Sequence, residues 1–179
     1  MSIAQLKDQL PDYARDLKLN LSIVGGTTSE LSPRQMWGTA LAAAIATGRL
    51  ALIAAVTADA AQHLDETAQR AARAAAAIMG MNNVYYRFVH FLGEDSDYAR
   101  MPARLRMQVI GNPGVDALDF ELWCLAVSAI HGCQACVRAH EKVVRDKGAT
   151  ATMVQDAVRV AAVLHGVAGV LIAEAAQAA

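Results

Sequence analysis

The chain has 179 residues, of which 55% are hydrophobic and only 5% aromatic, and its formal net charge is −1. This length suits one domain, or two small fused halves that share a core. The near-neutral charge, with no basic stripe, argues against nucleic acid and anionic lipid as partners. Alanine supplies much of the apolar total, and it favours close-packed helices over strands.

The N-terminal residues 1–8 are charged and amphipathic and lack the apolar centre of a secretion signal. Uncharged runs such as residues 122–137 are shorter than the roughly 20 residues that a bilayer span takes. We therefore expect a soluble cytoplasmic protein with no membrane partner. In that compartment the three cysteines argue against a structural disulfide framework, and a CxxC pair is more often redox-active or metal-binding.

The first half of the chain is predicted to be helical. Pro11 stops a short amphipathic segment over residues 3–10, and a second follows over 13–21, before a glycine-containing loop at 24–29. Ser32, Pro33 and Gln35 form the pattern of a capping box with proline at the first helical position. The helices expected after it cover residues 35–47, 50–61 and 66–92, the last with a potential break near Gly80.

The second half continues in helices after a polar loop at 93–101. A short helix is expected over 104–110, and Asp116 is a suitable cap for a helix that reaches residue 130. A further helix over 133–147 ends at Gly148, and Thr152 opens the last helix with Gln155 at its third position. No segment alternates with period two, so the sequence predicts an all-α fold.

An internal repeat with an offset of 86 residues underlies this pattern. Trp37 falls on Trp123, and Gly80 falls on Gly166. We interpret the chain as one domain built from a duplicated helical unit, with a first half over 1–92 and a second over 93–179. The positions that match Glu121, Cys133, Cys136 and His140 hold Gln35, Thr47, Leu50 and Ala54. The first half therefore lacks these reactive groups, and we expect one site per chain, in the second half.

The four reactive residues suggest redox chemistry. Helical spacing places Cys133, Cys136 and His140 within one arc of about 60°. Positions three apart on a helix bring Cα atoms to about 5 Å, within the range that a disulfide needs. A reactive cysteine must be a thiolate. Gly132 suggests a helix start beside the first sulfur, whose dipole would favour the anion, and His140 is close enough in sequence to take the proton of Cys136.

Glu121 lies in an apolar stretch of the preceding helix, between Phe120 and Leu122. A carboxylate there is costly unless it has a partner. If the two helices pack, it can face His140, orient the ring and support its positive form. The predicted proton relay runs from Glu121 through His140 to Cys136, with room for a bridging water.

These motifs resemble the alkyl hydroperoxide reductase D (AhpD) family, which belongs to the carboxymuconolactone decarboxylase-like superfamily. The matching segments are Phe120-Glu121-Leu122-Trp123, residues 126–130, Gly132-Cys133-x-x-Cys136, Ala139-His140-Glu141, and residues 17–21, 36–39 and 79–87. The similarity therefore covers nearly the whole chain. It implies an all-helical homotrimer with the activity of a lipoyl-dependent peroxiredoxin, with no bound cofactor and no metal.

The resemblance also implies roles for the site residues. Cys136 would attack the peroxide and become a sulfenic acid. Cys133 would resolve it through a Cys133–Cys136 disulfide and meet the reductant, with Glu121 and His140 as the proton relay. The implied reductant is dihydrolipoamide on a 2-oxoacid dehydrogenase component, and electrons could pass on to a partner peroxiredoxin. Two departures are Ala135, where some members carry histidine, and His131, where asparagine is common; His131 could tune the first thiol or cap the preceding helix.

Three alternatives remain open from the sequence. Cys133, Cys136, His140 and either Glu121 or His131 could bind zinc, although two thiols on one helix face would hold it awkwardly. A decarboxylase or isomerase of the same superfamily could use the acid and the imidazole alone, which leaves the two thiols unused. The chain could also be a trimeric adaptor without activity.

The remaining notable residues are predicted to be structural. Cys124 is expected in the core, His63 and His90 at the surface or a helix end, and His165 in the interior or at an interface. Trp37 and Trp123 are expected as core anchors, and Met79, Met81, Met101 and Met107 as core fillers. A polar set in an otherwise apolar helix is consistent with a subunit contact or a pocket edge and, equally, with solvated surface: Asn82, Asn83, Tyr85, Tyr86 and Arg87. The alanine-rich last helix could pack against a neighbouring chain.

Overall fold

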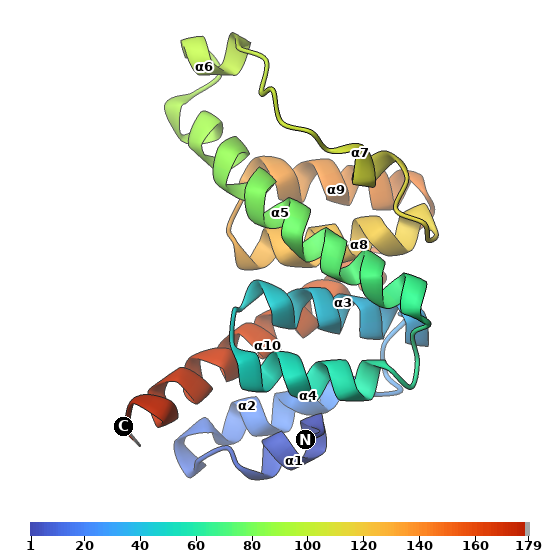
Figure 1. Ribbon diagram of the computed structural model, residues 1–179, viewed down its shortest axis with the longest axis vertical. Helices are drawn as coiled ribbons and strands as arrows, with labels where there is room; N and C mark the ends of the chain where they lie inside the picture. The colour runs from blue at the N-terminus through green and yellow to red at the C-terminus, as the bar shows by residue number, and fades with distance from the viewer. Residues whose placement is uncertain (178–179) are drawn as a thin grey trace.

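The computed structural model describes residues 1–177, and all of its regular structure within that range is helical, which confirms the all-α prediction (Figure 1). The elements are α1 Ile3–Asp8, the 3₁₀ turn η1 Asp12–Ala14, α2 Arg15–Asn20, the 3₁₀ turn η2 Leu21–Ile23, α3 Pro33–Ala46, α4 Leu50–Ala60, α5 Glu66–Leu92, α6 Asp97–Arg100, α7 Gln108–Gly111, α8 Ala117–Ile130, α9 Gln134–Asp146 and α10 Ala151–Gln177.

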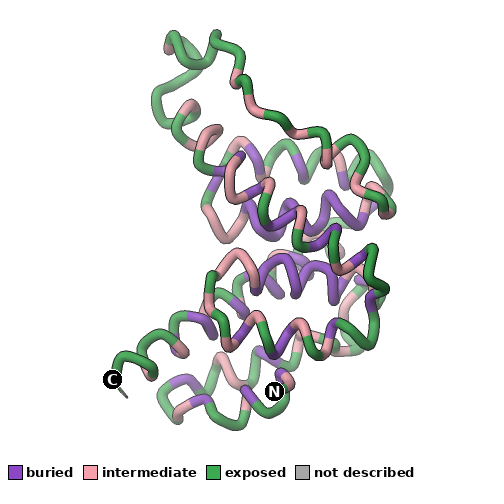
Figure 2. The backbone as a smooth tube through the Cα atoms, in the orientation of Figure 1, coloured by how far each residue is buried: buried purple, intermediate pink, exposed green. Residues whose placement is uncertain are grey.

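Two helices, α3 and α8, form the centre of the molecule. They pack on each other, α5 lies across both, and α10 contacts both as well (Figure 1). Helix α9 packs between α8 and α5, whereas α4 and α1 lie on the other side of α3. The buried residues concentrate along α3 and α8, and the far end of α5 with α6 is largely exposed (Figure 2). This arrangement brings helices α8 and α9, which carry the reactive residues, against α5.

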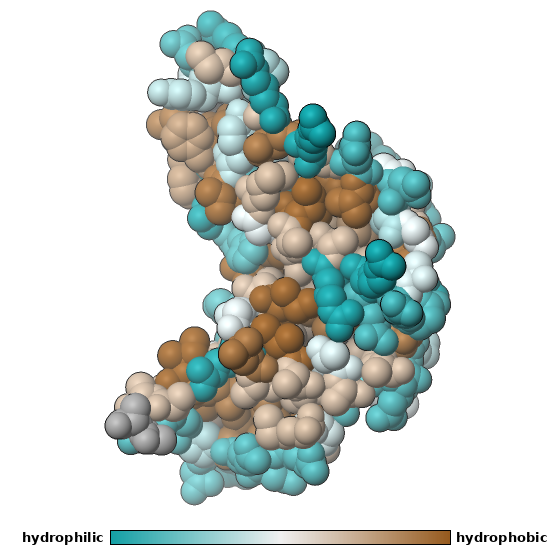
Figure 3. Space-filling view, viewed as in Figure 1, coloured by the Kyte–Doolittle hydropathy of each residue, from teal (hydrophilic) through white to brown (hydrophobic). Residues whose placement is uncertain are grey.

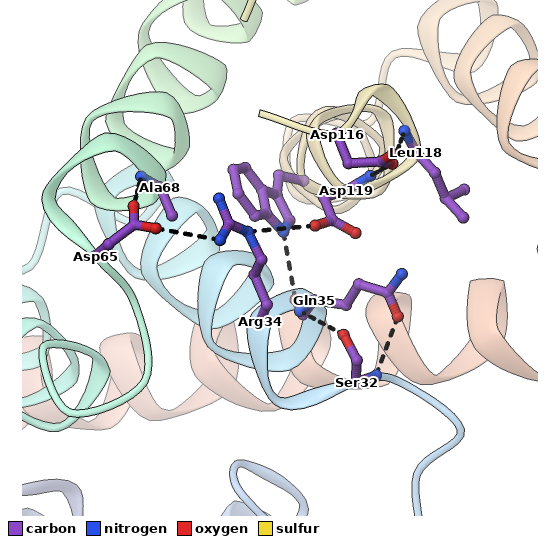
Figure 4. A network of polar contacts seen from close by, with 9 residues as sticks. Ser32, Arg34, Gln35, Asp65, Ala68, Asp116, Leu118 and Asp119 are labelled. Atoms are coloured by element: carbon purple, nitrogen blue, oxygen red, sulfur yellow. Dashed lines mark hydrogen bonds and ion pairs between the residues drawn. The ribbon is translucent and has the colours of Figure 1, made fainter. Parts of the chain in front are cut away.

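The starts of three helices are held together by one polar network (Figure 4). Ser32 Oγ accepts from the Gln35 N–H at 3.2 Å, and Gln35 Oε1 accepts from the Ser32 N–H at 3.0 Å, so the predicted capping box is confirmed. Arg34 then pairs with Asp65, the cap of α5, at 3.2 Å and with Asp119 of α8 at 3.5 Å. Burial raises the pKa of the Asp119 carboxyl, an effect that a hydrogen bond to Gln35 partly offsets.

The two tryptophans are buried, as predicted, but in different settings. Trp123 is fully buried and donates from Nε1 to the Gln35 carbonyl at 3.3 Å, whereas Trp37 stacks on His63 with 4.8 Å between ring centroids. A Cβ built on Gly38 would lie 2.1 Å from Trp123 Cε2. Only glycine therefore lets α3 and α8 approach this closely.

Several predicted boundaries are wrong. Helix α5 runs through Gly80 without a break, because one glycine costs a long helix only about 1 kcal/mol. The polar loop at 93–101 contains the short helix α6, and the helix predicted over 104–110 is replaced by α7, since Arg104 has a positive φ of 52° that a helix does not allow. Helix α10 begins two residues earlier than predicted, because Thr150 rather than Thr152 caps it: Thr150 Oγ1 accepts from the Met153 N–H at 3.0 Å.

The helix bounds are consistent with the 86-residue offset. Adding 86 to α3, α4 and α5 gives 119–132, 136–146 and 152–178, close to the bounds of α8, α9 and α10. The division into halves at residue 92 stays a prediction.

Helix α10 is, among residues 1–177, the one helix long and apolar enough by length and composition to cross a membrane. Of its most apolar 18-residue window, 44% is buried against the rest of the chain, and the helix contacts α3 and α8. This packing accounts for much of its apolar character.

Candidate active site

The CxxC pair lies at a turn between two helices. Helix α8 ends at the cap residue His131, Gly132 takes a left-handed φ of 66°, and Cys133 is the N-cap of α9. Cys133 therefore lies just before the helix, whereas it was predicted to be the first residue within it. Its sulfur accepts from the Cys136 N–H at 3.3 Å, and the two cysteines form a disulfide with Cα atoms 5.3 Å apart. The positive end of α9 therefore faces the Cys133 sulfur.

The two sulfurs differ in their access to solvent. Cys133 is completely buried, whereas Cys136 is 6% exposed and lines a cavity. The cavity has a volume of about 210 Å³ and is lined by Asn82, Tyr86, Ala135, Cys136, Ala139 and His140. A small molecule in this cavity meets Cys136 and not Cys133.

Glu121 and His140 form a buried pair beside this cavity. The distance between Glu121 Oε2 and His140 Nδ1 is 2.6 Å, and both side chains are about nine-tenths buried. Because a carboxylate only accepts hydrogen bonds, Nδ1 carries the proton of this contact. The contact predicted from the sequence is thus present, and it fixes the ring so that Nε2 is the nitrogen that does not contact Glu121.

His140 Nε2 faces Met79 Sδ of α5 at 3.1 Å. Among the residues that the structure describes, no hydrogen bond joins His140 to Cys136, although both line the same cavity. A proton that passes between them therefore needs a bridging water or substrate. Met79 is fully buried, as predicted, but it also contacts the imidazole, which its apolar type did not indicate.

Helix α5 also holds the turn that precedes Cys133. Asn83 Nδ2 donates to His131 Nδ1 at 3.1 Å, and Asn83 Oδ1 accepts from Ser128 Oγ at 3.1 Å. Arg87 Nη1 donates to the His131 carbonyl. His131 is the C-cap of α8, one of its two predicted roles. Ser128 is a site residue that was not predicted, because its only signal in the sequence is a hydroxyl group in an apolar helix.

The polar set on α5 divides between two tasks. Asn82 and Tyr86 line the cavity, which agrees with the pocket-edge alternative, whereas Asn83 and Arg87 bind the turn. Tyr85 packs edge-on against Tyr86, with ring centroids 5.3 Å apart.

Other predicted residues lie away from this cluster. Cys124 is buried and is not in a disulfide, and burial, followed by the nearby Glu121 charge, raises the pKa of its thiol well above the ordinary value. His63 and His90 are exposed, as expected, with His90 hydrogen-bonded to Gln134 at 2.6 Å. His165 is exposed in the chain, so the interior alternative is wrong.

Two further observations concern the sulfur-bearing and metal-binding residue types. Met101 is 57% exposed, so its assignment as a core filler is wrong, and Met81 and Met107 are only partly buried. Within residues 1–177 no three side chains of histidine, cysteine, aspartate or glutamate are grouped as a metal shell. Glu121 and His140 instead bind each other, and the two sulfurs are joined.

The fold and the site together define a class: an all-helical protein with a disulfide-forming CxxC pair at a helix start, next to a buried carboxylate–imidazole pair.

Residues 96–179 match the family model described as the carboxymuconolactone decarboxylase family. Proteins named alkyl hydroperoxide reductase AhpD are similar over nearly their whole length. The one from Rhodospirillum centenum is 59% identical over 98% of this chain and 94% of its own. Those from Gluconacetobacter diazotrophicus and Maricaulis maris are 58% and 56% identical, over 96% and 97% of this chain and 93% and 99% of theirs. The chain belongs to the AhpD family.

Proposed function

We propose that this chain is an alkyl hydroperoxide reductase in which Cys136 attacks the peroxide. The observation that carries the proposal is that Cys136 and His140 line one cavity, while Nδ1 of that histidine is bonded to buried Glu121. The name of the similar proteins supports the same reaction. A buried acid–imidazole pair beside a thiol is an arrangement suited to general acid–base catalysis.

The first step begins from the reduced protein. His140 Nε2, through a water, takes the proton of the Cys136 thiol, and the resulting imidazolium is stabilised by the Glu121 carboxylate at 2.6 Å. The thiolate attacks the terminal oxygen of ROOH, the O–O bond breaks, and Cys136 becomes a sulfenic acid. The departing RO⁻ takes the proton back from the imidazolium and leaves as the alcohol.

The second step closes the disulfide. The Cys133 sulfur attacks the sulfenic sulfur, and water leaves with the proton of the Cys133 thiol. The two Cα atoms are 5.3 Å apart, so the bond forms without a large backbone movement. Cys133, as the N-cap of α9, lies where the helix dipole favours a thiolate.

An external dithiol must then reopen the bond by exchange. We propose dihydrolipoamide, carried by a 2-oxoacid dehydrogenase component, with onward transfer of electrons to a partner peroxiredoxin; both rest on the family resemblance. Cys133 is completely buried in the disulfide form. For a reductant to meet this sulfur, as the resemblance implies, the turn at Gly132 has to open.

We further propose that the chain works in the cytoplasm as a homotrimer. Large apolar side chains are exposed on the outer part of α5 and beyond it, where a neighbouring chain could cover them: Val84, Phe88, Phe91, Leu92, Tyr98 and Met101. The face in Figure 3 is hollowed between its two ends, and apolar residues gather along the hollow. Sedimentation equilibrium tests the assembly, and a monomer at micromolar concentration would contradict it.

The test of the reaction is mass spectrometry of the reduced protein after one equivalent of tert-butyl hydroperoxide. In the wild type we expect a mass loss of two hydrogens and a disulfide between the peptides that contain Cys133 and Cys136. In Cys136→Ser we expect that Cys133 is not oxidised. In Cys133→Ser we expect a trapped sulfenic acid on Cys136. Turnover with reduced lipoamide separates the enzyme from an inert adaptor. Thiols that stay free after peroxide, or zinc bound to the reduced protein, would contradict the proposal.

A further inference from the structure

The cavity beside Cys136 contains a buried polar atom that has no partner. Asn82 is 4% exposed, and its Oδ1 makes no hydrogen bond with any of the residues described. Burying a carbonyl oxygen without a partner costs free energy, so such atoms are rare in folded proteins. Asn82 lines the cavity together with Cys136 and His140. The residue that carries the unsatisfied acceptor is therefore part of the wall of the cavity that holds the reacting sulfur.

Neighbouring residues do not explain this asparagine. Asn83, the next residue, is fully satisfied in its role, because it bonds both Ser128 and His131. The buried Thr39 Oγ1 is also without a partner, but Thr39 is not among the residues that line the cavity. Asn82 thus combines an open hydrogen-bonding capacity with a position on the wall of the site.

We propose that Asn82 binds the terminal O–H of the hydroperoxide, an inference that rests on the proposed peroxidase function. A hydroperoxide ROOH has one donor, the hydrogen on its terminal oxygen. The amide Oδ1, which is buried in this structure, accepts it once the Asn82 side chain turns toward the cavity. That bond holds the terminal oxygen, the atom that the Cys136 thiolate attacks, against the sulfur. The O–O bond then breaks, oxygen and its hydrogen stay on Cys136 as the sulfenic acid, and RO⁻ leaves to be protonated by His140.

The rest of the lining indicates which hydroperoxides fit. Ala135 and Ala139 of α9 supply apolar wall, and Tyr86 lies one turn beyond Asn82 on α5. The volume of about 210 Å³ is below the roughly 300 Å³ at which pockets for drug-sized ligands begin. The cavity therefore takes a short or compact alkyl group, with the alkyl chain against the alanines and the peroxide against the amide.

The test compares Asn82→Leu, which keeps size and removes both polar atoms, with Thr39→Val, which removes a buried unpartnered hydroxyl away from the cavity. The reduced full-length proteins are mixed with excess tert-butyl hydroperoxide, and the rate constant of disulfide formation is measured by acid quench and thiol counting. We expect a loss of about tenfold for Asn82→Leu, the value of one hydrogen bond, and no change for Thr39→Val.

Two further measurements separate binding from structure. The rate of alkylation by iodoacetamide reports the reactivity of the Cys136 thiolate itself, and it should be unchanged in Asn82→Leu. The unfolding midpoint of this variant should not fall, because the substitution removes a buried carbonyl oxygen that has no hydrogen-bond partner among the residues described. If Asn82→Leu is unstable, Asn82→Ala carries the same prediction. Ala139→Leu, which narrows the cavity, should slow tert-butyl hydroperoxide more than hydrogen peroxide.

The outcomes distinguish this inference from the reaction on which it rests. A wild-type protein that peroxide does not oxidise overturns both. A wild type that is oxidised and an Asn82→Leu variant that is oxidised at the same rate overturn only the role of Asn82. An equal loss of rate with peroxide and with iodoacetamide also overturns it, because the variant would then have altered the thiol.

Discussion

Replacing Glu121 by glutamine tests the proton relay with the smallest change in shape. The carboxylate lies 2.6 Å from His140 Nδ1, and both side chains are about nine-tenths buried. Glutamine can still accept from Nδ1 through its carbonyl oxygen, so the ring keeps its orientation. What is lost is the negative charge that supports the imidazolium formed when Cys136 gives up its proton.

The size of the effect follows from the change in hydrogen-bond type. A net contribution of about 1.5–3 kcal/mol for a bond to a charged group falls to about 0.5–1.5 kcal/mol for a neutral one. The difference of about 1–2 kcal/mol raises the barrier to thiolate formation, which corresponds to a rate lower by a factor of roughly 5 to 30.

The assay is disulfide formation in the reduced protein with tert-butyl hydroperoxide at pH 7. The matched control is Glu141→Gln, the same chemical change one residue after His140, in an exposed side chain whose nearest ion pair, with Arg145, is 3.9 Å long. That variant should react at the wild-type rate. If Glu121→Gln also keeps the full rate, the relay through His140 is refuted, whatever the family likeness suggests.

Three further predictions concern packing, thiol chemistry and pH. Gly38→Ala should destabilise the protein by about 1–3 kcal/mol, because the added Cβ would lie 2.1 Å from the Trp123 side chain. Gly80→Ala, whose added Cβ would meet no described atom within 4 Å, should stabilise it by about 0.5–1 kcal/mol. Urea unfolding measures both changes, and the opposite order would show that α3 and α8 are not packed as described. In the native reduced protein iodoacetamide at pH 8 should label Cys136, which lines the cavity, and not Cys124, because burial raises the pKa of the Cys124 thiol. A label on Cys124 without unfolding would contradict its burial. The hydrogen bond from the Ala68 N–H holds the pKa of the Asp65 carboxyl below its ordinary value of 3.8. The ionised Asp65 therefore stabilises the folded protein fully above pH 3.8, and this stabilisation is lost as the pH falls below that value. In Asp65→Asn the unfolding midpoint should therefore fall less steeply than in the wild type as the pH is lowered. An unchanged dependence on pH would mean that other carboxylates cause the loss of stability in acid.

Local sequence patterns were sufficient for the helices and for the members of the reactive cluster. The capping box at Ser32 and Gln35 formed as predicted, because its hydrogen bonds are made within four residues. The Glu121–His140 contact was also predictable, since a carboxylate in an apolar helix needs a partner and the imidazole lies on the next helix along the chain.

Short-range patterns failed where a backbone angle or distant packing decided the outcome. The helix expected over 104–110 did not form because Arg104 has a positive φ, which its residue type does not announce. Met101 is apolar and was predicted to fill the core, but it is exposed. His165 was predicted in the interior or at an interface, and its exposure in the chain rules out the interior.

Only the tertiary structure decided what surrounds the cysteines. Met79, Asn82, Asn83 and Arg87 come from α5, and their contacts with the CxxC region reach across 44 to 61 residues of chain. A sequence shows which residues share one helix face, but not which other helix that face meets. The amino-acid order therefore determined the chemistry available, and the crossing of α5 over α8 and α9 determined which side chains can act together, because packing between distant helices depends on the whole core.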